Sequence, residues 1–224
     1  MSACVRRGAL FAAWCVLSLC AQAAGGHHAV DDAAVLDVGT CKLELWAERE
    51  TGGARSLHHV GTGCRVGPVE LSLNLDKEKQ ATVDVATSVG PQIKWVYALN
   101  EAVSVGAVAS ARFNSQSPRY ASSTLVLPLT WRATDTLSAH LNWGRNFLRG
   151  GVGQPRGGVS LEWAPVSDVS LVAERFREAA NNSTRVGARY ALTPEVKLDI
   201  SRARSLNAGG VSWWTAGLIW EFGR

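Results

Sequence analysis

Two groups of residues in this chain have types and spacings that could do chemistry. In the first group, His27 and His28 are followed closely by Asp31 and Asp32. Imidazole and carboxylate groups bind zinc, copper or nickel, so these four residues are candidates for a metal site. A polar, flexible leader also accounts for this composition. We therefore predict no firm metal ligand and no cofactor.

The second group combines serine, histidine and a polar residue to orient the histidine. Ser138 or Ser160 could act as a nucleophile with His140 as its base, and Glu162 or Asn142 could orient the imidazole. Such a set would make the protein a lipid hydrolase. No family motif surrounds these residues, however, and a single histidine among polar neighbours is more often a hydrogen-bonded filler. We predict no catalytic residues and a protein that is not an enzyme.

β-Strands are the elements that must position these residues. Past residue 40 the apolar residues show no helical period, whereas several segments alternate apolar and polar residues with a period of two. In residues 69–76, for example, valine and leucine alternate with polar side chains. We predict about twelve strands, with ten to twelve as the range, near residues 41–50, 56–66, 69–76, 81–98, 103–113, 121–132, 137–146, 157–164, 169–177, 184–192, 196–204 and 211–222.

The connections between these strands are predicted to alternate in length. The longer loops are residues 114–120, 145–156, 178–183 and 205–210, and the shorter turns are residues 100–101, 134–136, 165–168 and 193–195. An even-stranded barrel with both chain ends in the periplasm has short periplasmic turns and longer outer loops. A soluble sandwich has no reason to sort its loops in this way.

The last strand carries a further signal. Thr215, Gly217, Trp220 and Phe222 have the spacing polar-x-Gly-x-x-aromatic-x-aromatic. This spacing resembles the C-terminal signal by which the barrel assembly machinery recognises outer-membrane proteins, although two more residues follow the last aromatic residue here. Over its mature length the chain resembles small outer-membrane β-barrel proteins of Gram-negative bacteria.

This resemblance implies a fold, a location and partners. The expected fold is all-β, a closed antiparallel transmembrane up-and-down β-barrel with a short N-terminal extension. The barrel assembly machinery would insert the protein into the outer membrane, where it would contact lipid and lipopolysaccharide. The resemblance does not supply a substrate.

The N-terminus is typical of a secretory signal. Arg6 and Arg7 precede the apolar residues 9–20, and a small-x-small pattern follows at residues 21–23. We predict a signal peptide at 1–23, a flexible N-terminal periplasmic segment at 24–40 and a β-barrel domain at 41–224. Loss of the two arginines lowers the formal net charge from +4 to +2, which gives no reason to expect a nucleic-acid partner.

Two cysteines, Cys41 and Cys64, remain in the mature chain, in an exported and therefore oxidising setting. A Gly-Gly pair at residues 52–53 is a good two-residue hairpin turn. Folding the chain there places Cys41 opposite Cys64 and Trp46 opposite His59. We predict a first hairpin closed by a structural disulfide.

If the face that carries the aromatic residues is outward, the opposite face carries charges of both signs. Inside a lumen such groups must pair or stay hydrated. A narrow barrel would then have a salt-bridged interior, and a wider one would hold a wet channel. The charged residues predicted to face the lumen are Glu70, Asp84, Lys94, Arg112, His140, Glu162, Arg185, Arg189, Lys197, Asp199 and Glu221.

Three functions remain open from the sequence. The first is a non-enzymatic outer-membrane barrel, either a narrow channel for small polar solutes or a structural barrel with a salt-bridged interior. The second is a soluble periplasmic β-protein that binds a ligand or a transition metal, which would have to bury leucines such as Leu125 and Leu141. The third is a lipid-modifying outer-membrane enzyme, which requires a contact between a serine and His140.

Overall fold

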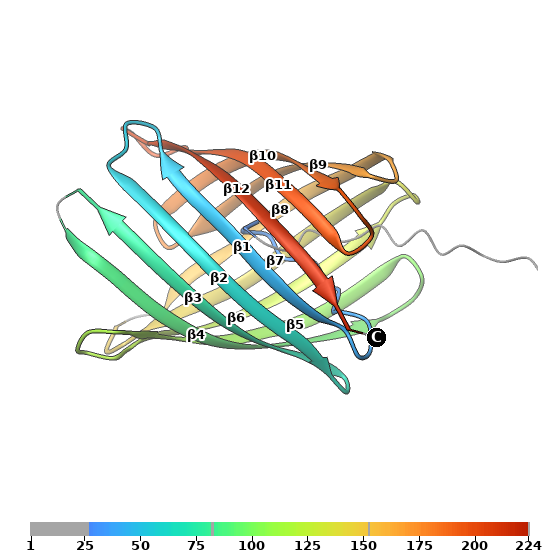
Figure 1. Ribbon diagram of the computed structural model, residues 1–224, viewed down its shortest axis with the longest axis horizontal. Coiled ribbons are helices and arrows are strands. Elements are labelled where there is room, and N and C mark those ends of the chain that lie inside the picture. The colour runs from blue at the N-terminus through green and yellow to red at the C-terminus, as the bar shows by residue number, and fades with distance from the viewer. Residues whose placement is uncertain (1–26, 82, 152, 224) are drawn as a thin grey trace, which may run out of the picture.

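Twelve strands form a closed barrel in the computed structural model, which describes residues 27–81, 83–151 and 153–223 (Figure 1). The predicted signal peptide and residues 24–26 lie outside the described residues. In chain order the strands are β1 (Cys41–Glu50), β2 (Arg55–Val66), β3 (Val69–Gln80), β4 (Val83–Ala98), β5 (Val103–Asn114), β6 (Tyr120–Arg132), β7 (Leu137–Leu148), β8 (Gln154–Val166), β9 (Val169–Glu178), β10 (Asn181–Ala191), β11 (Val196–Ser205) and β12 (Ser212–Phe222).

Each strand is antiparallel to the strands that precede and follow it, and the barrel closes where β12 pairs with β1. The predicted fold class, a closed antiparallel up-and-down barrel of about twelve strands, is therefore confirmed. Among the described residues, no helix is long and apolar enough to cross a membrane. We call the end of the barrel where β1 starts and β12 ends the near end, and the opposite end the far end.

The two ends differ less in loop length than predicted. The far-end connections are residues 51–54, 81–82, 115–119, 149–153, 179–180 and 206–211, and the near-end connections are residues 67–68, 99–102, 133–136, 167–168 and 192–195. The long loops predicted at 145–156 and 178–183 are wrong, because the hydrogen-bonded ladder continues through most of both. Glycine, asparagine and charged residues there indicated loops, but many of these residues pair in extended strands.

The outward face of the barrel is apolar. Leu125, Leu127, Leu129 and Leu141 leave between 36% and 48% of their surface exposed. A soluble barrel would bury these side chains and expose its charges, so the arrangement is the reverse of what the soluble alternative requires.

Aromatic residues surround the outward face at the near end. They lie on the five strands β4, β6, β8, β10 and β12, which all end there, and they are Trp95, Tyr97, Trp131, Trp163, Tyr190, Trp220 and Phe222. Tryptophan and tyrosine have an apolar body and a polar tip, so such a girdle suits the boundary between an apolar layer and water.

The first hairpin has the predicted disulfide. Cys41 and Cys64 are bonded, and they are direct partners in the ladder between β1 and β2. The connecting turn contains Gly52 and Gly53, whose φ angles are 101° and 78°. Only glycine adopts such angles without steric cost, so this Gly-Gly pair permits the tight reversal that aligns the cysteines.

Candidate functional site in the barrel lumen

A cavity of about 2260 Å³ lies inside the barrel. Its lining includes Asn207 and Gly209 from the far end, and Asp168 and Thr193 from the near end. One connected space therefore reaches both ends of the barrel, and charged side chains from almost every strand line it.

The charged residues predicted to face the lumen lie as follows. Arg112 and Glu221 line the cavity, and the side chain of Asp84 lies outside the described part of the chain. The other predicted residues are buried, and they are Glu70, Lys94, His140, Glu162, Arg185, Arg189, Lys197 and Asp199.

Neighbouring strands neutralise several of these charges. The Nε atom of Arg189 on β10 lies 2.7 Å from a carboxylate oxygen of Asp199 on β11. The ammonium group of Lys197 on β11 lies 2.6 Å from Glu221 on β12. Charges taken out of water are tolerated when they are paired and hydrogen-bonded, so these contacts let the wall hold both signs.

The sequence interpretation missed a ladder of inward charges on β1. Lys42 lies 2.9 Å from both Glu44 and Glu70, and Glu48 is buried. The same alternation that assigned the other strands was present here, because leucine and alanine occupy the positions between these charges. The inward Glu174 of β9 was missed as well. Its neighbours on the same face are the apolar residues Phe176 and Val172, so this strand does not show a polar inward face.

Residues 27–40, which we call the lumen segment, lie inside the barrel over 27–36 and are exposed at 37–39. Asp31 and Asp32 contact the ammonium group of Lys94 on β4, at 2.9 Å and 2.7 Å. The backbone N–H of Ala33 donates to Thr130 Oγ1, and its carbonyl accepts from Ser104 Oγ, both at 2.8 Å. The segment is therefore held by charge pairs and by backbone hydrogen bonds to the wall.

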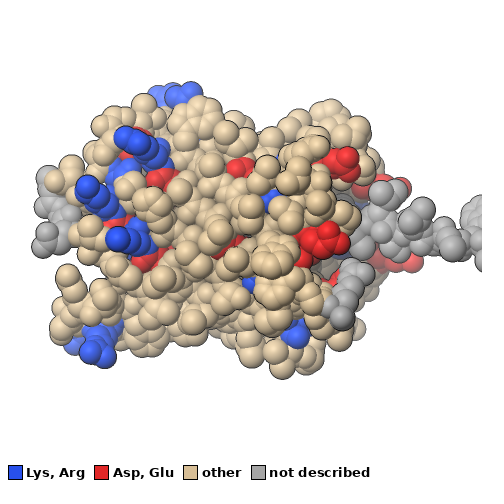
Figure 2. Space-filling view, viewed as in Figure 1, with Lys and Arg blue, Asp and Glu red and all other residues tan. Residues whose placement is uncertain are grey.

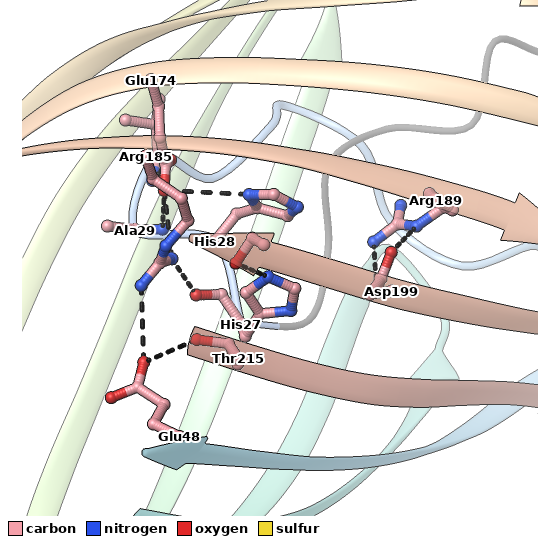
Figure 3. A network of polar contacts seen from close by, with 11 residues as sticks. His27, His28, Ala29, Glu48, Glu174, Arg185, Arg189, Asp199 and Thr215 are labelled. Carbon is pink, nitrogen blue, oxygen red and sulfur yellow. Dashed lines mark hydrogen bonds and ion pairs between the residues drawn. The ribbon is translucent and has the colours of Figure 1, made fainter. Parts of the chain in front are cut away.

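Glu174 holds the next part of the segment (Figure 3). Its carboxylate accepts from the backbone N–H groups of Ala29 and Val30, at 3.3 Å and 3.0 Å. The same carboxylate lies 3.0 Å from Arg185, which also donates to the carbonyl of His27. Val30 is fully buried, so the segment contributes an apolar side chain to the interior as well.

These contacts concern the flexible periplasmic segment that was predicted at 24–40. Within it, residues 27–36 contact the inner wall. The reason is that wall acceptors such as Glu174 and Thr130 satisfy the backbone N–H groups of the segment. These partners lie far away in the sequence, so no local pattern indicated them.

The two histidines of the segment, which were weak candidates for metal ligands, contact other groups of the protein. His27 Nε2 lies 2.7 Å from Ser201 Oγ, and the ring stacks on His28 with 4.5 Å between centroids. Burial, followed by the nearby positive charges, lowers the pKa of His27 well below its usual range. Asp31 and Asp32 point instead to Lys94. Within the described ranges no group of three histidine, cysteine or acidic residues is placed to hold a metal.

The far half of the lumen pairs its charges within the wall. Arg55 lies 3.1 Å from Glu48 and 2.7 Å from Glu78, and so bridges three strands. Arg156 and Glu178 form another pair at 2.7 Å, between β8 and β9. No residue of the lumen segment takes part in these pairs.

The chain matches the model of one protein family over residues 12–222, and that family is described as Uncharacterised conserved protein UCP029691. The chain belongs to this family. None of the curated proteins matches it.

Solved structures of porins and transporters have a similar fold. The KdgM porin gives a TM-score of 0.65 at 13% identity, over 81% of this chain and 99% of that one. The NanC porin gives 0.65 at 11% identity, over 80% and 98%. The toluene transporter TbuX of Ralstonia pickettii gives 0.54 at 9% identity, over 84% and 90%. At these identities the likeness concerns the fold alone.

Among the described residues His140 makes no hydrogen bond with Ser138 or Ser160, the contact that a lipid-modifying enzyme requires. His140 Nδ1 lies 2.8 Å from Thr130 Oγ1, and its Nε2 lies 3.6 Å from Glu162. Ser138 and Ser160 are both buried in the wall beside it. His140 Nδ1 therefore shares Thr130 with the lumen segment, while His140 Nε2 and Ser160 Oγ are buried without a hydrogen-bond partner among the described residues.

Proposed function

We propose that the protein is a non-enzymatic outer-membrane channel for small polar solutes, and that the lumen segment narrows it. The apolar outward wall and the aromatic girdle at the near end support a place in a membrane. With the near end on the periplasmic side, both ends of the barrel domain lie in the periplasm. The segment then enters the lumen from that side.

The observation that carries the proposal is the connected cavity of about 2260 Å³ whose lining comes from both ends. A barrel with a filled interior would hold only separate small voids. Because the wall neutralises its acids and bases in pairs, we expect little preference between anions and cations.

The polar lining also favours polar solutes over hydrocarbons. One solved structure of the KdgM porin is described as a complex with disordered oligogalacturonate, and TbuX is described as a toluene transporter. In the present chain the cavity is lined by charged groups such as Arg112, Lys94 and Glu78. A hydrocarbon is less stable beside such groups than in the apolar layer of the membrane, so it gains nothing by entering the lumen.

Conductance in planar bilayers tests this proposal. The mature chain is refolded in detergent, and its folded state is checked by a gel shift between unboiled and boiled samples. We expect discrete conductance steps in potassium chloride, with similar permeability for both ions. If neither the folded wild type nor a folded variant without the lumen segment conducts, the proposal is wrong and the barrel is structural.

We also propose that Thr215, Gly217, Trp220 and Phe222 are read by the barrel assembly machinery. Trp220 and Phe222 are exposed on the outward face of β12, with 4.8 Å between their ring centroids. Phe222→Ala should lower the amount of protein in outer-membrane fractions, as measured by immunoblot. Phe147→Ala, an outward aromatic residue on β7, is the matched control. Equal amounts in both variants would contradict this role.

A further inference from the structure

The outward wall has charges of one sign and at one end only. Every acidic residue on a strand with a described side chain is either buried or lines the interior cavity. The outward positions carry only cations, all near the far end. These exposed residues are Arg49, Lys77, Lys79, Arg145, Arg175, Arg177, Arg202 and Arg204. Figure 2 shows Lys and Arg side chains gathered at the far end of the face drawn, on the left.

These cations have no carboxylate partner in the described part of the chain. The ion pairs found there all involve inward-facing or lumen-segment residues. Eight exposed cations at one end of an apolar wall give that end a positive potential, which attracts anions from outside the protein.

A groove of about 620 Å³ lies within this cationic zone. Two rows of outward residues form it across β11, β12, β1 and β2, and the row nearer the far end continues to Lys79 on β3. The floor is made of small residues, Ala47, Ala216 and Ser56. Larger side chains surround the floor, and they are Arg49, His58, Lys79, Ile200 and Trp214.

The two rows differ in chemistry. In the row nearer the far end, Lys79, Arg49 and Arg202 lie on alternate strands, with Ser56 and Trp214 between them. Strand spacing places such neighbours about 10 Å apart. The guanidinium group of Arg202 lies 5.4 Å from the centroid of the Trp214 ring, which fixes it beside the groove.

The other row, nearer the middle of the barrel, is more apolar. It contains Ile200, Ala216 and Ala47, which are direct neighbours across β11, β12 and β1, and it ends at His58 on β2. An occupant with a negatively charged head and an apolar tail would therefore meet cations at one side of the groove and an apolar floor at the other.

We propose that this groove binds a phosphate-bearing lipid of the leaflet that the far end contacts. Arg49 and Lys79 bind the phosphate, Arg202 adds a second cation, and an acyl chain lies along Ala47, Ala216 and Ile200. Arginine suits this role because its planar donors match phosphate oxygens in a bidentate way. The proposal uses the membrane placement proposed above, but it does not depend on conduction.

Native mass spectrometry of the folded mature chain tests this site. The probes are diphosphoryl lipid A and the same lipid without its phosphates, and the gel shift on boiling confirms the fold of each variant. We expect the phosphorylated lipid to bind more tightly. Arg49→Gln with Lys79→Gln should weaken it by about 25-fold, because each cation near a lipid surface contributes about fivefold.

Arg145→Gln with Arg177→Gln is the matched control. It removes two outward cations of the same end that lie outside the groove and donate to loop carbonyls. Ala216→Leu fills the floor without changing charge, and it should also weaken the phosphorylated lipid. Equal losses from the two double variants would overturn the groove as a site. Equal binding of the two lipids by the wild type would overturn the role of phosphate.

Discussion

The near half and the far half of the lumen both pair charges within the wall, as between Lys197 and Glu221 in the near half, but only the near half also pairs wall charges with the lumen segment. In the near half, Lys94 of the wall pairs with Asp31 and Asp32 of the lumen segment. In the far half, Arg55 pairs with Glu48 and Glu78, which belong to the wall itself. Part of the charge pairing in the near half therefore depends on a segment outside the barrel strands, and the pairing by Arg55 in the far half does not.

This difference means that the width of the channel can change while the barrel stays folded. Hydrogen bonds between twelve strands close the barrel, and residues 27–36 of the segment add to none of these ladders. Side chains such as Lys94, Glu174 and Thr130 hold the segment instead. Changes in the near half should therefore alter conductance while the barrel stays folded, and changes in the far half should alter it much less.

Lys94→Met is expected to have the largest effect. It removes the only described ammonium group beside Asp31 and Asp32, and unpaired buried charges cost about 3–5 kcal/mol. The segment should leave the lumen, so that proteolysis within residues 27–40 becomes faster and conductance rises. Lys77→Met, an outward lysine, is the control and should behave as the wild type. Equal protection of the segment in both variants would contradict this prediction.

Acid should release the segment through His27. Burial lowers the pKa of His27 in the folded state, whereas the released segment has the ordinary value of 6.5. The released state therefore binds a proton as the pH falls below 6.5, and at pH 5 this shifts the equilibrium toward release by about thirtyfold. Conductance should be higher at pH 5 than at pH 7.5. His27→Gln should reduce this dependence, and an unchanged dependence would exclude His27 as its cause.

Arg55→Gln should have the smallest effect. The side chain of Arg55 is one-third exposed, and exposed ion pairs contribute about 1 kcal/mol or less. Because Glu48 and Glu78 stay fixed in their strands, conductance should remain close to that of the wild type. A change as large as that of Lys94→Met would mean that both halves narrow the channel to the same extent.

The sequence allowed the barrel to be predicted nearly strand by strand. Residues 69–76 show why, since their strict alternation of apolar and polar residues places Glu70 inward and leucines outward. The disulfide could also be predicted, because a turn at Gly52 fixes the register of the hairpin, and that register places Cys41 opposite Cys64.

The lumen segment was beyond the reach of such patterns. His27, Asp31 and Asp32 form a polar stretch that is equally compatible with a free leader, a metal site or a buried strap. Their partners Lys94 and Ser201 are 62 to 174 residues away, so only the closed barrel brings them together. The far-end strand extensions were missed for a simpler reason, because a polar strand and a polar loop have the same composition.

The most direct test of the account is the unitary conductance of a variant that lacks residues 27–36. This variant keeps the turn in which Thr40 donates to Asp37 and the bond from Arg65 to Thr40, so β1 should start as in the wild type. The account predicts that the variant still shifts on a gel as a folded barrel and that each channel conducts more than the wild type. Equal unitary conductance of the two folded proteins would contradict it.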